Sequence, residues 1–278
     1  MKNYVDGKVI VITGASEGFG RSLAQKTAEM GAKVVCAARR EEKLKEIVDG
    51  IKAKGQSAEY VVTDVSDRKQ VEHMIDFAVK TYGAVDVLVN NAGIMPLAFF
   101  EDHHKAIEKW ERCIDTNTKG TLFGICAVYD QMIKQGHGHI INLDSIYGNW
   151  PSRGAAVYGM TKNGNGFLAD ALRLESKGKI NVTTVRPTGC RPTGLTGQVV
   201  NPKAIEGILV ESSLDDYFAI EQSINEGKES EYSDPESMKY FVLSADILVD
   251  SMIYCINQPL GVSISDITVR ATGEYYMI

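Results

Sequence analysis

The chain has 278 residues, of which 44% are apolar, and its 36 acidic and 30 basic residues give a formal net charge of −6. This apolar content is sufficient for a sizeable core and excludes a disordered chain. Interspersed charges of both signs argue against a nucleic acid or an anionic membrane as partner, because such partners select a basic stripe.

The cysteines and the N-terminus indicate where the protein works. Five cysteines stand alone along the chain, with none of the close spacings of a metal cluster, so we expect no bound metal. Scattered cysteines are typical of a reducing cytosol, and no apolar run reaches the length of a membrane span. The first apolar run, 8–13, leads into a glycine motif and does not read as a signal peptide. We therefore expect a cytoplasmic protein without a membrane partner.

Short apolar runs alternate with longer helical patterns over most of the chain. The runs of strand length are 8–13, 33–38, 59–65, 85–93, 139–145, 180–187 and 264–270. Helical spacing is found in 18–30, 44–51, 67–82, 105–136, 156–177 and 244–257. Strand runs that are apolar throughout indicate burial on both faces of a parallel sheet. The alternation predicts an α/β fold, a doubly wound parallel sheet of the Rossmann type with helices on both faces, in a single domain over 1–278.

One stretch, 194–242, interrupts this alternation of strand and helix patterns. It is rich in glycine, serine, asparagine and acidic residues, with weak helical patterns at 202–211 and 214–226. We interpret it as an insertion inside the domain. Its glycines and scattered apolar side chains fit a hinged lid that closes over a hydrophobic substrate. They equally fit a fixed insertion against the sheet or a neighbouring subunit.

A glycine-rich turn, TGASEGFG at 13–20, follows the first strand and opens the first helix. Gly14 allows the tight turn, Gly18 lets the backbone approach a pyrophosphate, and Gly20 permits close packing of the helix on the strand. The start of the helix supplies unpaired N–H groups and the positive end of its dipole. Glycines in this strand–turn–helix context predict a dinucleotide site.

The motifs along the chain resemble, in order, those of the short-chain dehydrogenase/reductase family. The turn has the family's TGxxxGxG spacing, NNAG stands at 90–93, Asn117 lies in DTNTKG, Ser145 ends a strand in INLDSIYG, and YGMTK at 158–162 matches the YxxxK pair. The ordered set covers residues 7–193. The resemblance implies an enzyme that transfers a hydride between a nicotinamide and a carbonyl or alcohol substrate. The last strand resembles that of members acting on small hydroxy acids.

Tyr158 and Lys162 lie four residues apart, so their side chains share one face of a helix. A free tyrosine has a pKa of about 10, and a nearby lysine cation should lower that pKa by favouring the phenolate. We predict that Tyr158 is the general acid and base and that Ser145 donates a hydrogen bond to the same substrate oxygen. The family resemblance implies that Lys162 contacts the cofactor ribose and that Asn117 holds a water molecule that connects Lys162 to solvent.

The cofactor residues are assigned from the glycine turn and from the resemblance. They are Gly14, Ser16, Gly18, Phe19, Gly20, Arg39, Arg40, Asp64, Val65, Asn91, Ala92, Gly93, Tyr158, Lys162, Pro187, Thr188, Gly189 and Thr193. The second strand ends in Ala38, Arg39 and Arg40, without the acidic residue that would bind a ribose 2′-hydroxyl. A guanidinium suits a 2′-phosphate, whereas Glu17 is unfavourable beside one. We therefore expect NADP(H) as the preferred cofactor, with NAD(H) possible. Asp64 resembles the family residue that contacts the adenine.

Three features depart from the family's pattern. Asp144 stands where relatives often have serine, and a carboxylate beside Ser145 should find a partner or face solvent. Phe19 replaces an aliphatic residue. In RPTGCRPTG, Thr188 replaces a glycine and Thr193 stands one position late. We expect the substrate pocket to include Ser145, Trp150, Tyr158 and Cys190.

The expected substrate is either a hydroxysteroid or a smaller hydroxy acid. Two other classes of protein share this fold. One is a nucleotide-sensing protein without turnover, which commonly lacks the Tyr–Lys pair. The other is a sugar-nucleotide epimerase or dehydratase, which usually has TGxxGxxG and a larger C-terminal domain. We favour a carbonyl reductase or alcohol dehydrogenase with a small-molecule substrate and no nucleic-acid partner. Extra apolar positions in 105–136 and in the Tyr158 helix, which pair across a two-fold axis in relatives, predict a homodimer or homotetramer.

Overall fold

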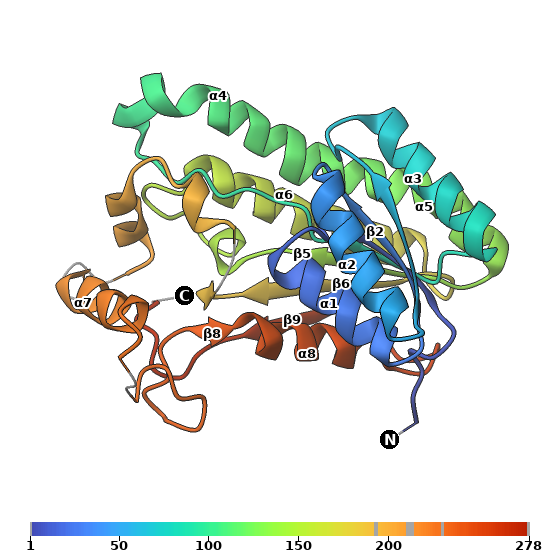
Figure 1. Ribbon diagram of the computed structural model, residues 1–278. Coiled ribbons are helices and arrows are strands. Elements are labelled where there is room, and N and C mark those ends of the chain that lie inside the picture. The colour runs from blue at the N-terminus through green and yellow to red at the C-terminus, as the bar shows by residue number, and fades with distance from the viewer. Residues whose placement is uncertain (1, 192–193, 210–213, 229–230, 277–278) are drawn as a thin grey trace.

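The computed structural model of the chain describes residues 2–191, 194–209, 214–228 and 231–276. Its centre is a seven-stranded sheet in the order β3-β2-β1-β4-β5-β6-β9, with each neighbouring pair parallel (Figure 1). The strands are β1 (Val9–Thr13), β2 (Lys33–Ala38), β3 (Ser57–Val62), β4 (Val87–Asn90), β5 (His139–Leu143), β6 (Asn181–Pro187) and β9 (Asp266–Val269). A separate parallel pair joins β7 (Cys190–Arg191) to β8 (Leu243–Ser244). The predicted doubly wound parallel sheet is confirmed.

Helices cover both faces of the sheet. They are α1 (Gly18–Glu29), α2 (Glu41–Ala53), α3 (Arg68–Tyr82), α4 (His103–Cys113), α5 (Gly120–Gln135), α6 (Ala156–Glu175), α7 (Leu214–Asn225) and α8 (Ala245–Ile256). α1, α2 and α8 share one hydrophobic cluster that includes Leu23 and Ile47. α3, α5 and α6 share a second cluster that includes Met74 and Val128. The two clusters lie on opposite faces of the sheet, so the core has two layers.

The apolar strand runs are buried because their side chains alternate between these two layers. In β1, Ile10 and Ile12 belong to the cluster under α1, α2 and α8, whereas Val11 between them belongs to the other cluster. All residues of β1 are buried. A strand covered on both faces has no polar face, which explains why its sequence shows no alternation of polar and apolar residues.

The strand order reverses at β1, which pairs with β2 on one side and with β4 on the other. Chain connections leave these neighbouring strands towards opposite faces of the sheet, so their carboxyl ends flank a crevice. Thr13 ends β1 and Asn90 ends β4. The glycine turn and the NNAG motif therefore meet at this crevice.

The predicted helical stretch 105–136 forms a nearly continuous rod. α4 passes into α5 through a π-helical segment, Ile114–Lys119. Such π-helical turns are rare and often mark functional sites. Asn117 is buried within this segment, so the family's asparagine lies at the local change in helical pitch.

The insertion at 194–242 covers the carboxyl end of the sheet. It contains two 3-10 helices, Thr196–Gln198 and Pro202–Gly207, followed by α7, which lies at the end of the molecule opposite the N-terminus (Figure 1). Its apolar side chains and those of the strand-end loops form a third cluster, which includes Ile94, Leu97, Tyr147, Tyr158, Ala204, Ile208, Leu209, Tyr217, Ile220 and Phe241. The insertion is therefore packed over the end of the sheet where the sequence motifs converge.

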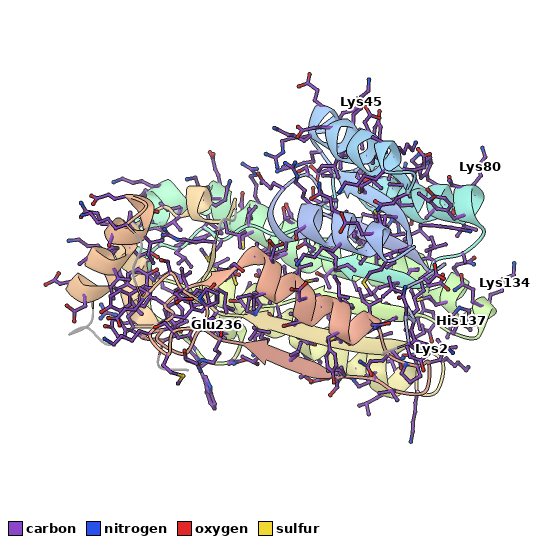
Figure 2. All side chains as sticks on the ribbon, turned by 60° about the horizontal axis from the view of Figure 1, so that its bottom comes forward. Lys2, Lys45, Lys80, Lys134, His137 and Glu236 are labelled. Carbon is purple, nitrogen blue, oxygen red and sulfur yellow. The ribbon has the colours of Figure 1, made fainter. Side chains whose placement is uncertain are left out.

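The outer faces of the helices are charged. Figure 2 shows the side chains of Lys45, Lys80 and Lys134 pointing away from the body of the molecule. The apolar face of each helix turns towards the sheet, as the spacing of Leu44 and Ile47 in α2 predicted. None of the described helices is both long and apolar enough to cross a membrane.

Candidate active site

The glycine turn joins β1 to α1 through backbone that other residues would strain. Gly14 has a φ of +66° and Gly18 a φ of +53°, in the left-handed region that favours glycine. A Cβ atom at Gly20 would lie 2.6 Å from the carbonyl oxygen of Gly14. Asn91 Nδ2 donates to the carbonyl oxygen of Thr13 at 2.8 Å, and the Asn91 N–H donates to the Thr13 hydroxyl at 3.0 Å. The NNAG motif therefore holds the turn at the end of β1.

The N-terminus of α1 opens on a cleft of about 270 Å³, which we call the glycine cleft. The side chain of the N-cap residue Glu17 makes no capping hydrogen bond to the first turn of α1, so N–H groups of this turn are available to an anionic ligand. Most residues assigned to the cofactor line this cleft: Gly14, Ser16, Gly18, Phe19, Arg39, Arg40, Asp64, Val65, Asn91, Ala92 and Gly93. Gly20 lies beneath the turn, and Thr193 lies outside the described residues. The backbone therefore forms a cradle of the kind that phosphates occupy.

Two exposed arginines lie along the glycine cleft. Arg40 Nη2 lies 2.8 Å from the Glu17 carboxylate and 2.8 Å from the Ser16 hydroxyl. This ion pair offsets the charge of Glu17, which the sequence alone presented as unfavourable beside a phosphate. Arg39 lines the same cleft. Arg39 is thus the arginine of this cleft that Glu17 does not balance, and the cleft also includes the carboxylate of Asp64.

The predicted catalytic side chains come together at the carboxyl ends of β4 and β5. The hydroxyl groups of Ser145 and Tyr158 share a hydrogen bond. Lys162 Nζ donates to the carbonyl oxygen of Leu143 at 2.6 Å and lies 5.8 Å from the centre of the Tyr158 ring. All of these side chains are buried, so any reaction at the Tyr158 hydroxyl takes place away from bulk water.

Asn117 connects the π-helical segment to the loop after β4. Its Oδ1 accepts a hydrogen bond from the Ile94 N–H at 2.9 Å, and its Nδ2 donates to the Ile94 carbonyl at 3.0 Å. Asn165 Nδ2 donates to the Asn117 carbonyl at 3.0 Å, which ties the segment to α6. A Cβ atom at Gly93 would lie 3.3 Å from Asn117 Oδ1 and 3.7 Å from Lys162 Nζ. Asn117 and Lys162 thus flank the same glycine.

Tyr158 lies on the wall of a second cleft of about 340 Å³, which we call the substrate cleft. Ser145 and Cys190 line it as expected, together with Lys162, Pro187, Thr188 and Gly189, which the sequence assigned to the cofactor. Trp150, also expected here, lies elsewhere: it is 64% exposed and lines a separate cavity with Phe100 and Met160. The loop after β5 turns outward at this residue and carries the indole away from Ser145.

The pKa of Tyr158 is raised, contrary to the expectation that the lysine would lower it. The phenol is only 4% exposed, and burial is the largest cause of the increase in its pKa. The hydrogen bond from Ser145 acts in the opposite direction, whereas the charge of Asp144 raises the pKa further. Burial also lowers the pKa of Lys162, which weakens the cation expected to favour the phenolate. Tyr158 is therefore a phenol at neutral pH.

Asp144 has found a partner, as the sequence required of a carboxylate at this position. Its side chain is 1% exposed, and its Oδ2 lies 3.4 Å from Nε of Arg186, which also pairs with Asp266. Burial raises the pKa of Asp144 to about 6, although the charges of Lys162 and Arg186 oppose the increase. A chain of charges therefore runs from Lys162 through Asp144 and Arg186 of β6 to Asp266 of β9.

Several residues of the substrate cleft carried no signal that sequence reasoning could use. Arg191 and Glu221 bring two charges to the cleft, and Tyr147, Tyr217 and Tyr276 bring aromatic rings. Tyr147 lies in a short 3-10 helix, Tyr217 and Glu221 lie in the insertion, and Tyr276 lies beyond the last strand. The sequence showed only scattered apolar side chains in the insertion, and Tyr217 is one of these.

A family model described as short chain dehydrogenase matches residues 8–204. An uncharacterised oxidoreductase of Listeria monocytogenes, Lmo0432, is 37% identical over 97% of this chain and 98% of its own. The NADP-dependent 3-hydroxy acid dehydrogenase YdfG of Shigella flexneri is also 37% identical, over 68% of this chain and 73% of its own.

Among solved structures, the closed form of serine dehydrogenase complexed with NADP+ has a TM-score of 0.75 and 28% identity, over 94% of each chain. The similarity to Lmo0432 and to this structure thus extends over nearly the whole chain.

The buried Asp144 carboxyl should make the protein lose stability as pH rises. Its pKa of about 6 in the folded chain lies above the ordinary value of 3.8, so protonation stabilises the folded state below the lower value and this contribution disappears as pH passes the higher one. Asp144→Asn removes the effect. We expect the free energy of unfolding of the variant, relative to the unmodified protein, to rise by about 3 kcal/mol between about pH 4 and about pH 7.

Urea unfolding of both proteins across this pH range measures the difference. Asp266→Asn is the matched control, because Asp266 is less buried and lies on the far side of Arg186. Parallel stability curves for the protein and Asp144→Asn would contradict the assignment.

Proposed function

Because the chain belongs to the short chain dehydrogenase family of oxidoreductases, we propose that it interconverts a ketone or aldehyde and its alcohol by hydride transfer, with Tyr158 as general acid and base. The observation that carries this proposal is the position of the Tyr158 hydroxyl. It hydrogen-bonds to Ser145 on the wall of the substrate cleft. Asn91 and Gly93 line both this cleft and the glycine cleft. A dinucleotide in one cleft can therefore reach a substrate in the other.

The glycine cleft fits a nicotinamide dinucleotide. The uncapped start of α1 and the left-handed Gly14 and Gly18 provide N–H groups for a pyrophosphate. We assign Arg39 and Arg40 to a 2′-phosphate, so NADP(H) is the preferred cofactor and NAD(H) a possible one. When bound, the nicotinamide donates or accepts the hydride. The NADP named for two of the similar proteins supports this assignment.

The proton in the reaction moves through Tyr158. In the reducing direction the phenol donates its proton to the substrate oxygen, and burial keeps the phenol protonated at neutral pH. Ser145 hydrogen-bonds the same oxygen while negative charge develops on it. In the oxidising direction the phenolate takes the alcohol proton, and the nearby Lys162 ammonium stabilises that phenolate. The Leu143 carbonyl holds Lys162 in place for this role.

Two features guide the choice among substrate and function classes. The names of the similar proteins, a 3-hydroxy acid dehydrogenase and a serine dehydrogenase, support a small hydroxy acid over a hydroxysteroid. Tyr158, Ser145 and Lys162 lie together in a cleft, which favours turnover over a nucleotide-sensing role. We place this activity in the cytoplasm, in keeping with the unpaired cysteines.

The proposed oligomer is a homodimer or homotetramer. On α6, Met160, Phe167 and Leu174 follow one another at seven-residue intervals and are exposed, so they form one apolar stripe. Leu122 adds an exposed apolar side chain on α5. A stripe of this kind on a helix surface is typical of a protein–protein interface. A two-fold axis would bury it against the same stripe of a second copy.

Replacing Tyr158 by phenylalanine should remove turnover and keep cofactor binding. The variant loses only the hydroxyl that transfers the proton, so we expect kcat to fall by about 100- to 10,000-fold. Turnover is followed by NADPH absorbance with a panel of ketones and aldehydes, and NADPH binding by protein fluorescence. A rate close to that of the unmodified protein would refute the role of Tyr158.

Replacing Arg39 by alanine should change the cofactor preference. Loss of a guanidinium that binds a 2′-phosphate should raise the KM for NADPH by about 10- to 100-fold and leave the KM for NADH nearly unchanged. Arg68→Ala is the control, because Arg68 lies on α3 outside both clefts and pairs only weakly with Glu72. Equal changes for both cofactors would show that Arg39 does not recognise the phosphate.

Replacing Phe167 by glutamate should dissociate the proposed oligomer. Phe167 is 75% exposed at the middle of the apolar stripe, and a charge buried at an interface without a partner strongly opposes association. Light scattering at micromolar concentration should give a dimer or tetramer mass for the unmodified protein and a smaller mass for the variant. Met238→Glu, at another exposed apolar residue, should leave the mass unchanged. A monomeric unmodified protein would contradict the proposal.

A further inference from the structure

An ion pair lies in the substrate cleft apart from the catalytic residues. Arg191, at the end of β7, pairs with Glu221 of α7. Arg191 Nη1 also donates to Asn225 Oδ1 at 2.6 Å. The side chains of Arg191 and Glu221 are 26% and 14% exposed, and both line the cleft that contains Tyr158 and Ser145.

An ion pair in this position is energetically costly, because the rest of the cleft wall is largely apolar. Ile94, Leu97, Val199 and Ile205 belong to that wall, and transferring charges into such surroundings costs several kcal/mol per ion before pairing. Among the described residues that line the substrate cleft, the other charged ones are Asp144 and Lys162. Those two lie beside Tyr158 and take part in the catalytic arrangement. Arg191 is therefore the cation that a substrate in the body of the cleft can reach.

Contacts with the described part of the chain leave several N–H donors of the Arg191 guanidinium unused. Arginine carries five N–H donors in a planar fork that matches a carboxylate. The contacts with Glu221 and Asn225 use the two terminal nitrogens, one contact each. Arg191 is also the more exposed member of the pair. It lies on a strand that follows directly from the cleft residues Thr188 and Gly189, so its position relative to the catalytic residues is set by short backbone.

We propose that Arg191 binds the carboxylate of a hydroxy acid substrate, and that Glu221 is the internal counter-ion with which this carboxylate competes. The inference rests on the proposed function and names its substrate class. In the absence of the acid, Glu221 and Asn225 hold the guanidinium. When the acid binds, its carboxylate takes the remaining donors and weakens the Glu221 contact, while its hydroxyl or keto oxygen lies at Tyr158 and Ser145.

Two variants should change acid recognition in opposite directions. Arg191→Met removes the cation and should raise the KM for hydroxy acids by about 10- to 100-fold. Glu221→Gln removes the competing anion at nearly constant size and should lower the same KM. The substrates are aliphatic hydroxy acids that differ in the distance between carboxylate and hydroxyl, each compared with its uncharged methyl ester. The esters should respond to neither variant by more than about 3-fold.

Opposite changes in the KM for hydroxy acids would distinguish substrate recognition by the pair from a purely structural role. If the ion pair only fastens α7 over the cleft, both variants weaken the same contact, and acids and esters change together and in one direction. Arg191→Lys keeps the charge and should retain part of the preference for acids. Arg68→Met, at the exposed Arg68–Glu72 pair of α3, is the control for loss of an arginine elsewhere. Thermal unfolding of each variant identifies any that fails to fold.

A binding measurement keeps this inference distinct from the proposed function. Calorimetric titration of each hydroxy acid and its ester into the protein–NADP+ complex reports recognition without turnover. Acid binding that depends on Arg191 without any hydride transfer would refute the proposed activity and support the carboxylate site. Turnover with equal losses for acids and esters in Arg191→Met would support the activity and overturn the carboxylate site.

Discussion

Asn91 ties the carboxyl ends of β1 and β4 together through hydrogen bonds to Thr13. These strands are neighbours at the point where the strand order reverses, so the tie sets the position of the glycine turn relative to the loop after β4. The uncapped start of α1 faces the glycine cleft because this turn is held close to the strands. Asn91 and Gly93 then line both clefts, which lets a cofactor and a substrate meet. A wider gap between the two strand ends would separate the phosphate cradle from Tyr158.

Burial shifts the pKa values of Tyr158 and Lys162 more strongly than neighbouring charges do. The Tyr158 phenol and the Lys162 ammonium lie on one face of α6, yet the surrounding apolar side chains raise the pKa of the tyrosine and lower that of the lysine. Each group is thereby moved towards its uncharged form. Asp144 adds a carboxylate at the same depth, and it is tolerated because Arg186 pairs with it. The charge of Asp144 raises the pKa of both Tyr158 and Lys162.

The insertion contributes part of the wall of the substrate cleft. Ile208, Leu209 and Tyr217 pack in the cluster that contains Tyr158, which excludes water from the phenol. The same segment carries Glu221 into the cleft, where Arg191 meets it. A single insertion thus provides both an apolar cover and one half of a charged pair. Apolar cover favours the reaction by strengthening the electrostatic interactions beneath it, and the charged pair is where selectivity among substrates can arise.

The sequence by itself determined the doubly wound sheet, the glycine turn and the Tyr158–Lys162 pair. Each of these leaves a local signature, since strands buried on both faces are apolar throughout, a phosphate turn needs glycines at fixed spacing, and one helical turn spans four residues. Trp150, Arg191 and Glu221 could not be placed in this way, because they lie in loops, short strands and an insertion without periodic patterns. Only the tertiary structure turned Trp150 outward and brought Arg191 and Glu221 into one cleft. It also decided the direction of the Tyr158 pKa shift, because desolvation depends on neighbouring side chains such as Ile94 and Tyr217 that come from distant parts of the chain.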